Sequence, residues 1–116
     1  MLFRSYFGGI RSGTDLAKII GLGMKAGIVG KAMGLALGGE IRDGQVSFQG
    51  DRTDAERVDG ASSLMNAMSA EISIMARCTG KTDVRNIEPE DLRSISITSA
   101  RAFGIALAGM KRGEMV

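Results

Sequence analysis

The sequence predicts an α/β fold over residues 1–42, followed by a polar loop at 43–57 and a helical extension at 58–116. Two observations favour α/β: short apolar runs alternate with helix-like runs, and a glycine turn follows each apolar run. A third observation, apolar residues recurring at spacings of three and four, predicts a long helix in the second half. With 116 residues, 44% of them hydrophobic and 24% charged, the chain has the size and composition of a single globular domain.

The first half shows the order of elements that defines parallel α/β proteins. A strand is expected at 2–7, where an aromatic run meets a double glycine. A helix follows, capped by Thr14 and ended by Gly23. The run at 25–29 is apolar and bounded by glycines, which is typical of a buried parallel strand, and a second helix is expected at 31–37.

The middle of the chain changes from polar to amphipathic. Residues 40–53 are expected to form a loop, with at best a short exposed hairpin arm at 45–49. The stripe of an amphipathic helix follows and Gly80 ends it. The stripe is expected to pack against the outside or base of a barrel, and an adaptable methionine-rich surface for a partner is the alternative. Its members are Val58, Ala61, Met65, Met68, Ile72 and Met75.

Two shorter helices are expected near the end of the sequence. One covers 86–92, where Pro89 suits the first turn of a helix. The other is capped by Thr98 and runs through Ala102, and the tail after Gly109 is expected to fray.

Two glycine turns, Gly8-Gly9 and Gly30-Lys31, follow the two expected strands. Parallel strands end at the same edge of a sheet, so both turns are expected to face one side. Glycine lets the backbone approach a phosphate closely, and helix N-termini present unpaired N–H groups. These turns therefore predict an anion site, and because the chain has 17 glycines, two ordinary turns are the alternative reading.

Three segments resemble FMN-dependent enzymes. The run GGIRSGTDLAK at 8–18, followed by Leu22-Gly23, resembles the seventh strand-loop-helix of FMN-dependent barrel oxidoreductases. The run GIVGKAMGLALG at 27–38 resembles their eighth strand and short phosphate-site helix. Farther on, AEI at 70–72, ARCTGKTDV at 76–84 and EPEDL at 88–92 resemble the segment that ends the FMN domain of glutamate synthase.

The resemblance to glutamate synthase implies the last two βα units of a TIM-type barrel followed by a C-terminal helical tail. It implies that Gly8, Gly9, Gly30 and Lys31 hold the FMN phosphate through backbone N–H groups, with the Lys31 side chain as an optional counter-charge. Arg11 is a weaker candidate, for which a surface salt bridge is the alternative. The flavin would carry electrons toward an iminoglutarate intermediate in glutamate biosynthesis. No catalytic residue is expected in this chain, because the earlier strands carry the substrate groups in the family.

The sequence departs from the family at several positions. Phe7 stands where relatives commonly have Ser, and Lys31 where they often have Thr or Arg. Gly38-Gly39 stands where a cysteine commonly begins the cluster-binding run of classical glutamate synthases. No iron-sulfur cluster is expected, because Cys78 is the single cysteine of the chain.

The sequence is too short for a whole barrel, which takes about 250 residues. The remaining strands are expected from another chain or from self-association, and activity is not expected from this chain alone. Two alternatives stay open. One is a non-catalytic α/β-helical assembly module, or a truncated fragment, that binds no flavin; the other is a barrel end like that of type 2 isopentenyl-diphosphate isomerase, which the helical tail disfavours.

Composition excludes several classes of function. A net charge of +2 with interspersed signs argues against a nucleic-acid partner. The absence of histidine excludes a Ser-His-Asp triad and a histidine zinc site. The single cysteine and the lack of a signal peptide pattern favour the cytoplasm.

A membrane span at 19–39 is also disfavoured. Lys25 and Lys31 would lie inside it, and each central lysine costs about 2.5–3.5 kcal/mol on insertion. Glu71 and Arg77, on the long helix, are expected to be solvated.

Overall fold

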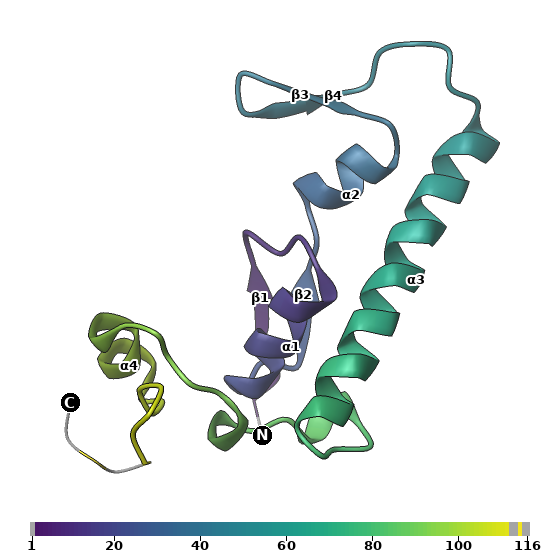
Figure 1. Ribbon diagram of the computed structural model, residues 1–116. Coiled ribbons are helices and arrows are strands. Elements are labelled where there is room, and N and C mark those ends of the chain that lie inside the picture. The colour runs from purple at the N-terminus through teal and green to yellow at the C-terminus, as the bar shows by residue number, and fades with distance from the viewer. Residues whose placement is uncertain (1, 112–113, 115–116) are drawn as a thin grey trace.

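The computed structural model describes residues 2–111 and residue 114, and it shows a mixed α/β chain of short sheets and helices. The described part is elongated, with principal extents of 56 × 34 × 30 Å. Helix α3 runs along one side of it, and the C-terminal helix α4 lies at one end (Figure 1). Within the described residues there are two separate two-stranded sheets and no closed barrel.

The order strand, helix, strand, helix is confirmed in the first half. It consists of β1 (Ser5–Phe7), α1 (Gly13–Gly21), β2 (Ala26–Ile28) and α2 (Lys31–Ala36). β1 and β2 pair in parallel, with Phe7 opposite Ile28. The cap of α1 was predicted wrongly: it is Ser12, whose hydroxyl accepts from the Asp15 N–H at 3.3 Å, and not Thr14.

The prediction of a buried strand at 25–29 is wrong for β2. Ala26 and Gly27 are half-buried and Ile28 is exposed. One face of β2 is covered by α1, because a Cβ placed on Gly27 would lie 2.5 Å from Leu16 Cδ1. The other face and the outer edge are open within the described residues, since no third strand pairs with β2.

The expected loop at 40–53 contains an antiparallel hairpin instead. Strands β3 (Glu40–Arg42) and β4 (Gln45–Ser47) are joined by Asp43 and Gly44, whose φ angles are +50° and +75°. Two such residues make the turn that matches the twist of a hairpin. Val46 then packs against α2, because a Cβ placed on Gly34 would meet its Cγ1 at 2.9 Å.

The long helix α3 (Asp54–Cys78) begins at a Thr53 cap, before the expected start at Val58. Of its predicted stripe only Met68 is buried, together with Ala76 farther along, whereas Met65 is 54% exposed. The expectation that the stripe packs against a barrel is therefore not met, because the described residues place no barrel wall beneath it. Part of the predicted stripe on α3, including Val58 and Met65, is therefore uncovered.

The core lies where α1, α3 and the following turn meet. Ala17, Ala76 and Ile87 form it, with Met75 and Val84 packed against them. Helices α1 and α3 approach each other closely, because a Cβ placed on Gly13 of α1 would collide with the Met68 carbonyl oxygen on α3. The smallness of this core leaves many apolar side chains exposed on the rest of the molecule.

The helix expected at 86–92 is replaced by two 3₁₀ turns, η1 (Val84–Asn86) and η2 (Pro89–Asp91). Proline disfavours the helical region for the residue before it, and Glu88 is accordingly extended, with φ −120° and ψ 164°. Helix α4 (Ile97–Phe103) is capped by Ser96 and not by Thr98. The predicted fraying after Gly109 falls largely on 112–113 and 115–116, outside the described residues.

Across the described part of the chain, no helix combines the length and the apolar character that crossing a membrane requires.

Candidate functional site

The two glycine turns lie together at one end of the parallel sheet. β1 and β2 finish level with one another, at the Phe7–Ile28 pair, so both turns leave the sheet on the same side. Gly8, Gly9, Gly30 and Lys31 line one cavity of about 700 Å³. The four residues singled out in the sequence are therefore brought together around one cavity.

Glycine is required by the backbone of the first turn. Gly8 and Gly9 have φ angles of +123° and +69°, which L side chains rarely adopt. A Cβ at either position would meet no atom within 4 Å, so the surroundings are open and the backbone is accessible. Within the described residues the Gly9 N–H has no hydrogen-bond partner, and an anion can therefore approach it directly.

The start of α2 also presents free donors. Its cap is Gly30, which has no side chain to accept from the first turn. The first backbone bond of the helix runs from the Gly34 N–H to the Gly30 oxygen, at 3.1 Å. The N–H groups of Lys31 and Ala32 thus have no partner in the part of the chain that the structure describes.

The start of α1, in contrast, is already occupied. Glu71 reaches across from α3, and its Oε2 accepts from the Thr14 N–H at 3.4 Å and from the Thr14 hydroxyl at 3.3 Å. The prediction that Glu71 is solvated is wrong, because its carboxylate is half-buried at this helix end. Among the described turns and helix starts next to the parallel sheet, the turn after β1 and the start of α2 therefore keep N–H groups without a partner.

Two cations line the cavity. Lys31 and Arg11 are both exposed, and neither side chain forms an ion pair with another described residue. The alternative of a surface salt bridge for Arg11 therefore finds no partner there. Its backbone N–H instead donates to Asp15 Oδ2 at 3.1 Å, which holds the turn against α1.

Sequence reasoning missed the apolar wall of the cavity. Phe7 lies beside Gly30, because a Cβ placed on that glycine would be 3.3 Å from the Phe7 ring. Ile41 comes from β3, in the segment that was expected to be a loop, and Leu35 comes from α2. The Asp-Gly pair at 43–44 was the available signal for the hairpin that brings Ile41 here.

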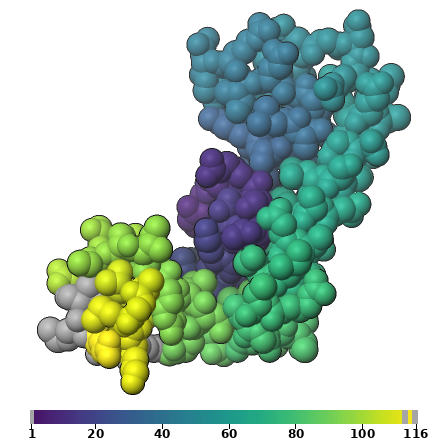
Figure 2. All heavy atoms as spheres, viewed as in Figure 1, coloured from purple at the N-terminus to yellow at the C-terminus, as the bar shows by residue number. Residues whose placement is uncertain are grey.

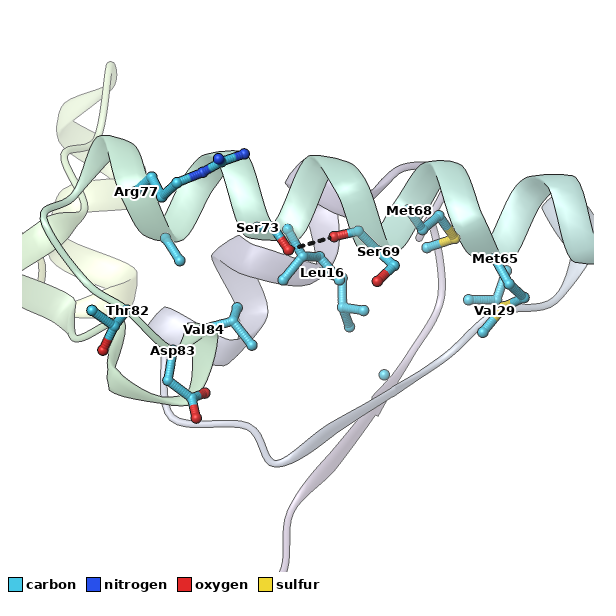
Figure 3. Close-up of a pocket in the computed structure, with 13 residues that line it drawn as sticks. Leu16, Val29, Met65, Met68, Ser69, Ser73, Arg77, Thr82, Asp83 and Val84 are labelled. Carbon is cyan, nitrogen blue, oxygen red and sulfur yellow. Dashed lines mark hydrogen bonds between the residues drawn. The ribbon is translucent and has the colours of Figure 1, made fainter.

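A second cavity, of about 680 Å³, lies between β2, α1 and α3 (Figure 3). Val29 and Met65 stand at one end of it, and Thr82 and Asp83 at the other. Most of its remaining wall is apolar and comes from Leu16, Met68, Ile72, Ala76 and Val84. We call this cavity the α3 groove.

Asp83, at the end of the α3 groove, has a carboxyl group whose pKa is shifted. The Arg85 side chain donates hydrogen bonds to its carboxylate, the shortest at 2.6 Å, and these lower the pKa of Asp83 from 3.8 to about 2. The same hydrogen bonds raise the pKa of Arg85. The pair is exposed and has the character of a surface ion pair that stiffens η1.

The described residues contain no group of three or more His, Cys, Asp or Glu side chains arranged to hold a metal ion.

The comparisons with known proteins give one distant relative. A glutamate synthase large subunit-like protein from Rhizobium meliloti (strain 1021) is 28% identical to this chain over 131 aligned positions. The alignment covers 88% of this chain and 30% of that protein, so the chain spans less than a third of the relative's length. No family model matches the chain, and no solved structure matches it. The similarity supports a distant relation to a protein of that name.

Proposed function

We propose that this chain forms the phosphate-anchoring C-terminal end of an FMN-dependent oxidoreductase resembling glutamate synthase. In this proposal β1 and β2 correspond to the last two strands of a TIM-type barrel, and α3 begins the helical tail. The observation that carries it is the meeting of Gly8, Gly9, Gly30 and Lys31 around one cavity at the C-terminal end of a parallel strand pair. The name of the distant relative agrees with an enzyme of this type.

The residues present fit a phosphate. Free backbone N–H groups at Gly9, Lys31 and Ala32 are donors that suit its oxygens, and the two glycines leave room for close approach. The Lys31 ammonium supplies a counter-charge at the same cavity. A cavity of about 700 Å³ is within the usual range for a small-molecule site. When bound, FMN supplies electron transfer; the chain's own residues bind the phosphate and orient the ligand.

The apolar wall gives the remainder of the ligand a place to extend. Phe7, Leu35 and Ile41 stand beside the glycine turns and carry no charge, so they suit the carbon skeleton next to a phosphate better than a second ionic group. The other strands of the barrel, supplied by another chain or by self-association, would complete the contacts to the flavin ring. The chain alone is accordingly proposed to anchor and not to catalyse.

A titration that compares FMN with riboflavin tests the phosphate site directly, because the two flavins differ only in the phosphate. Quenching of flavin fluorescence gives both dissociation constants. Charge-assisted hydrogen bonds contribute about 1.5–3 kcal/mol, so FMN is expected to bind at least about tenfold more tightly than riboflavin. Inorganic phosphate should compete with FMN and not with riboflavin.

Two lysine variants locate the site. Lys31→Met should weaken FMN binding and leave riboflavin binding unchanged. Lys25→Met is the matched control, because Lys25 is also exposed but precedes β2, at the opposite end of the strand. Equal affinity for the two flavins, or no binding of either, contradicts the proposal.

A non-catalytic assembly module is the second candidate. The small core and the two unpaired sheet edges favour it, because they leave apolar surface that association would cover. It predicts self-association without any flavin affinity, so the same titration separates the two candidates.

A further inference from the structure

Both strands of the parallel sheet have an unpaired edge within the described residues. The Lys25 N–H donates to the Arg4 oxygen at 2.8 Å, which fixes the direction of the backbone groups along each strand. Successive residues of a strand direct their backbone N–H and C=O groups to opposite edges. Arg4 and Lys25 face the partner strand, so Ser5 on β1 and Ala26 on β2 direct these groups to the outer edges of the sheet. Each copy therefore has one free edge on β1 and a different free edge on β2.

The free edge of β2 belongs to a strand that also lines the α3 groove, through Gly27. Gly27 and Val29 line the groove from the side of the sheet, and Met65, Met68 and Ile72 line it from α3. Figure 3 shows Val29 below Met65 and Met68 of the helix. α3 thus overhangs a space beside β2 in which no described strand lies. A strand added at this edge would pair with β2 and would bury the apolar face of α3.

The free edge of β1 belongs to an exposed apolar segment. Leu2, Phe3 and Phe7 are 78%, 75% and 69% exposed. Figure 2 shows the first part of the chain, in purple, next to the long helix. Leu2 and Phe3 precede β1 and Phe7 ends it. Exposed aromatic and aliphatic side chains in one short segment mark an interaction surface.

We propose that copies of this chain associate head to tail, with β1 of one copy pairing in parallel with β2 of the next and filling its α3 groove. Tyr6 is opposite Gly27 in the register, so it faces the helix side of the sheet and its side chain enters the groove of the next copy. Arg4 lies two residues earlier on the same face. In a parallel arrangement it approaches the end of the groove where Asp83 stands, already paired with Arg85.

A second copy is the occupant that fits both surfaces. The chain carries the exposed strand and the groove for it on opposite edges of one sheet, so a head-to-tail contact uses both and leaves neither open. Contacts of this kind close into rings when the rotation permits. Each copy contributes a parallel pair of strands, and because eight parallel strands close a barrel, the ring contains about four copies. The number of copies rests on the barrel of the proposed function, whereas the pairing of β1 with β2 stands whether or not the cavity at the glycine turns binds a flavin.

Light scattering coupled to size-exclusion chromatography, over a wide range of concentrations, tests the association. The expected mass is about four times the 12.2 kDa of the chain. Met65→Lys places a charge in the groove, and association should weaken by at least about tenfold because burying an unpaired charge is costly. Ile74→Lys is the matched control on the same helix: Ile74 is 47% exposed against 54% for Met65, and it lies outside the groove.

A second pair of variants tests the strand edge. Ser5→Pro removes an outward N–H of β1 without removing a bond to β2, and Ser5→Ala is its control. Ser5→Pro should dissociate the assembly with an unchanged circular dichroism spectrum, and Ser5→Ala should not. A monomer at every concentration, or an assembly that Met65→Lys leaves intact, overturns the proposal.

Discussion

Replacing Gly13 with alanine should destabilise the protein, although alanine is the better helix former. Gly13 is the first residue of α1 and is buried against α3. A Cβ there would collide with the Met68 carbonyl oxygen and would lie 2.6 Å from the Glu71 Cβ. Both atoms are fixed to the helix backbone, so no change of rotamer relieves the contact and α1 must move away from α3.

Favourable and unfavourable contributions to the free energy of unfolding decide whether Gly13→Ala stabilises or destabilises the protein. Alanine in place of glycine gains up to about 1 kcal/mol of helix propensity. Overpacking costs about 1–3 kcal/mol. Moving α1 also weakens the two hydrogen bonds from Thr14 to Glu71, each contributing about 0.5–1.5 kcal/mol. The free energy of unfolding should therefore fall by about 2–3 kcal/mol.

Gly21→Ala is the control for this prediction. A Cβ at Gly21 would meet Ile87 Cγ2 and Leu92 Cδ1, both at 3.0 Å, so a shift of these two side chains by a few tenths of an ångström relieves the contact. The expected change is within about 1 kcal/mol. Urea unfolding followed by circular dichroism measures both variants, at one fixed protein concentration because association raises apparent stability. A Gly13→Ala protein as stable as the wild type would refute the argument for tight α1–α3 packing.

Three further predictions follow from side-chain and turn geometry. Glu71→Ala should lower the free energy of unfolding by about 1 kcal/mol in urea, because Thr14 at the start of α1 loses its acceptor. The Asp83 carboxyl should titrate near pH 2 by NMR, and Arg85→Gln should return its midpoint toward 3.8. Because the pKa of Asp83 is lower in the folded than in the unfolded protein, the pair stabilises the fold above pH 3.8 and loses this effect as the pH falls toward 2. Gly44→Ala should weaken the β3–β4 hairpin by about 1–2 kcal/mol, because its φ is +75°, and cross-strand NOEs from Ile41 to Val46 would report the loss.

The order of elements could be predicted because its signals are local. Each early strand is a short apolar run next to a glycine, and α3 carries a periodic stripe, so a few neighbouring residues suffice. Helix starts could not be fixed in the same way, because Ser12 and Thr14 are both good capping residues and the three-dimensional path of the chain selects Ser12. For the hairpin the sequence allowed at best an arm at 45–49 and favoured a loop, because its strands are three residues long and largely polar, although its Asp43-Gly44 turn was visible.

Part of the candidate site could likewise be predicted from the sequence, and part of it could not. The glycine turns and Lys31 could be grouped from sequence, because parallel strands must end at the same edge. Glu71 could not be placed at the start of α1, since 57 residues separate it from Thr14. The exposure of the α3 stripe was equally hidden: periodicity shows which face is apolar, and it does not show whether anything covers that face.

The open sheet edge and the glycine cavity lie on the same pair of strands, so association and flavin binding are expected to be linked. Strand β1 of a neighbouring copy, placed beside β2, would bring its own glycine turn next to Gly30. If FMN binds the assembled form alone, saturation at about 100 times its dissociation constant adds about 2.7 kcal/mol to the assembly. FMN should then raise the assembled fraction in sedimentation velocity, and Met65→Lys should weaken FMN binding although Met65 lies outside the cavity. An assembly indifferent to FMN, with unchanged FMN affinity in Met65→Lys, would show that the groove and the cavity act independently.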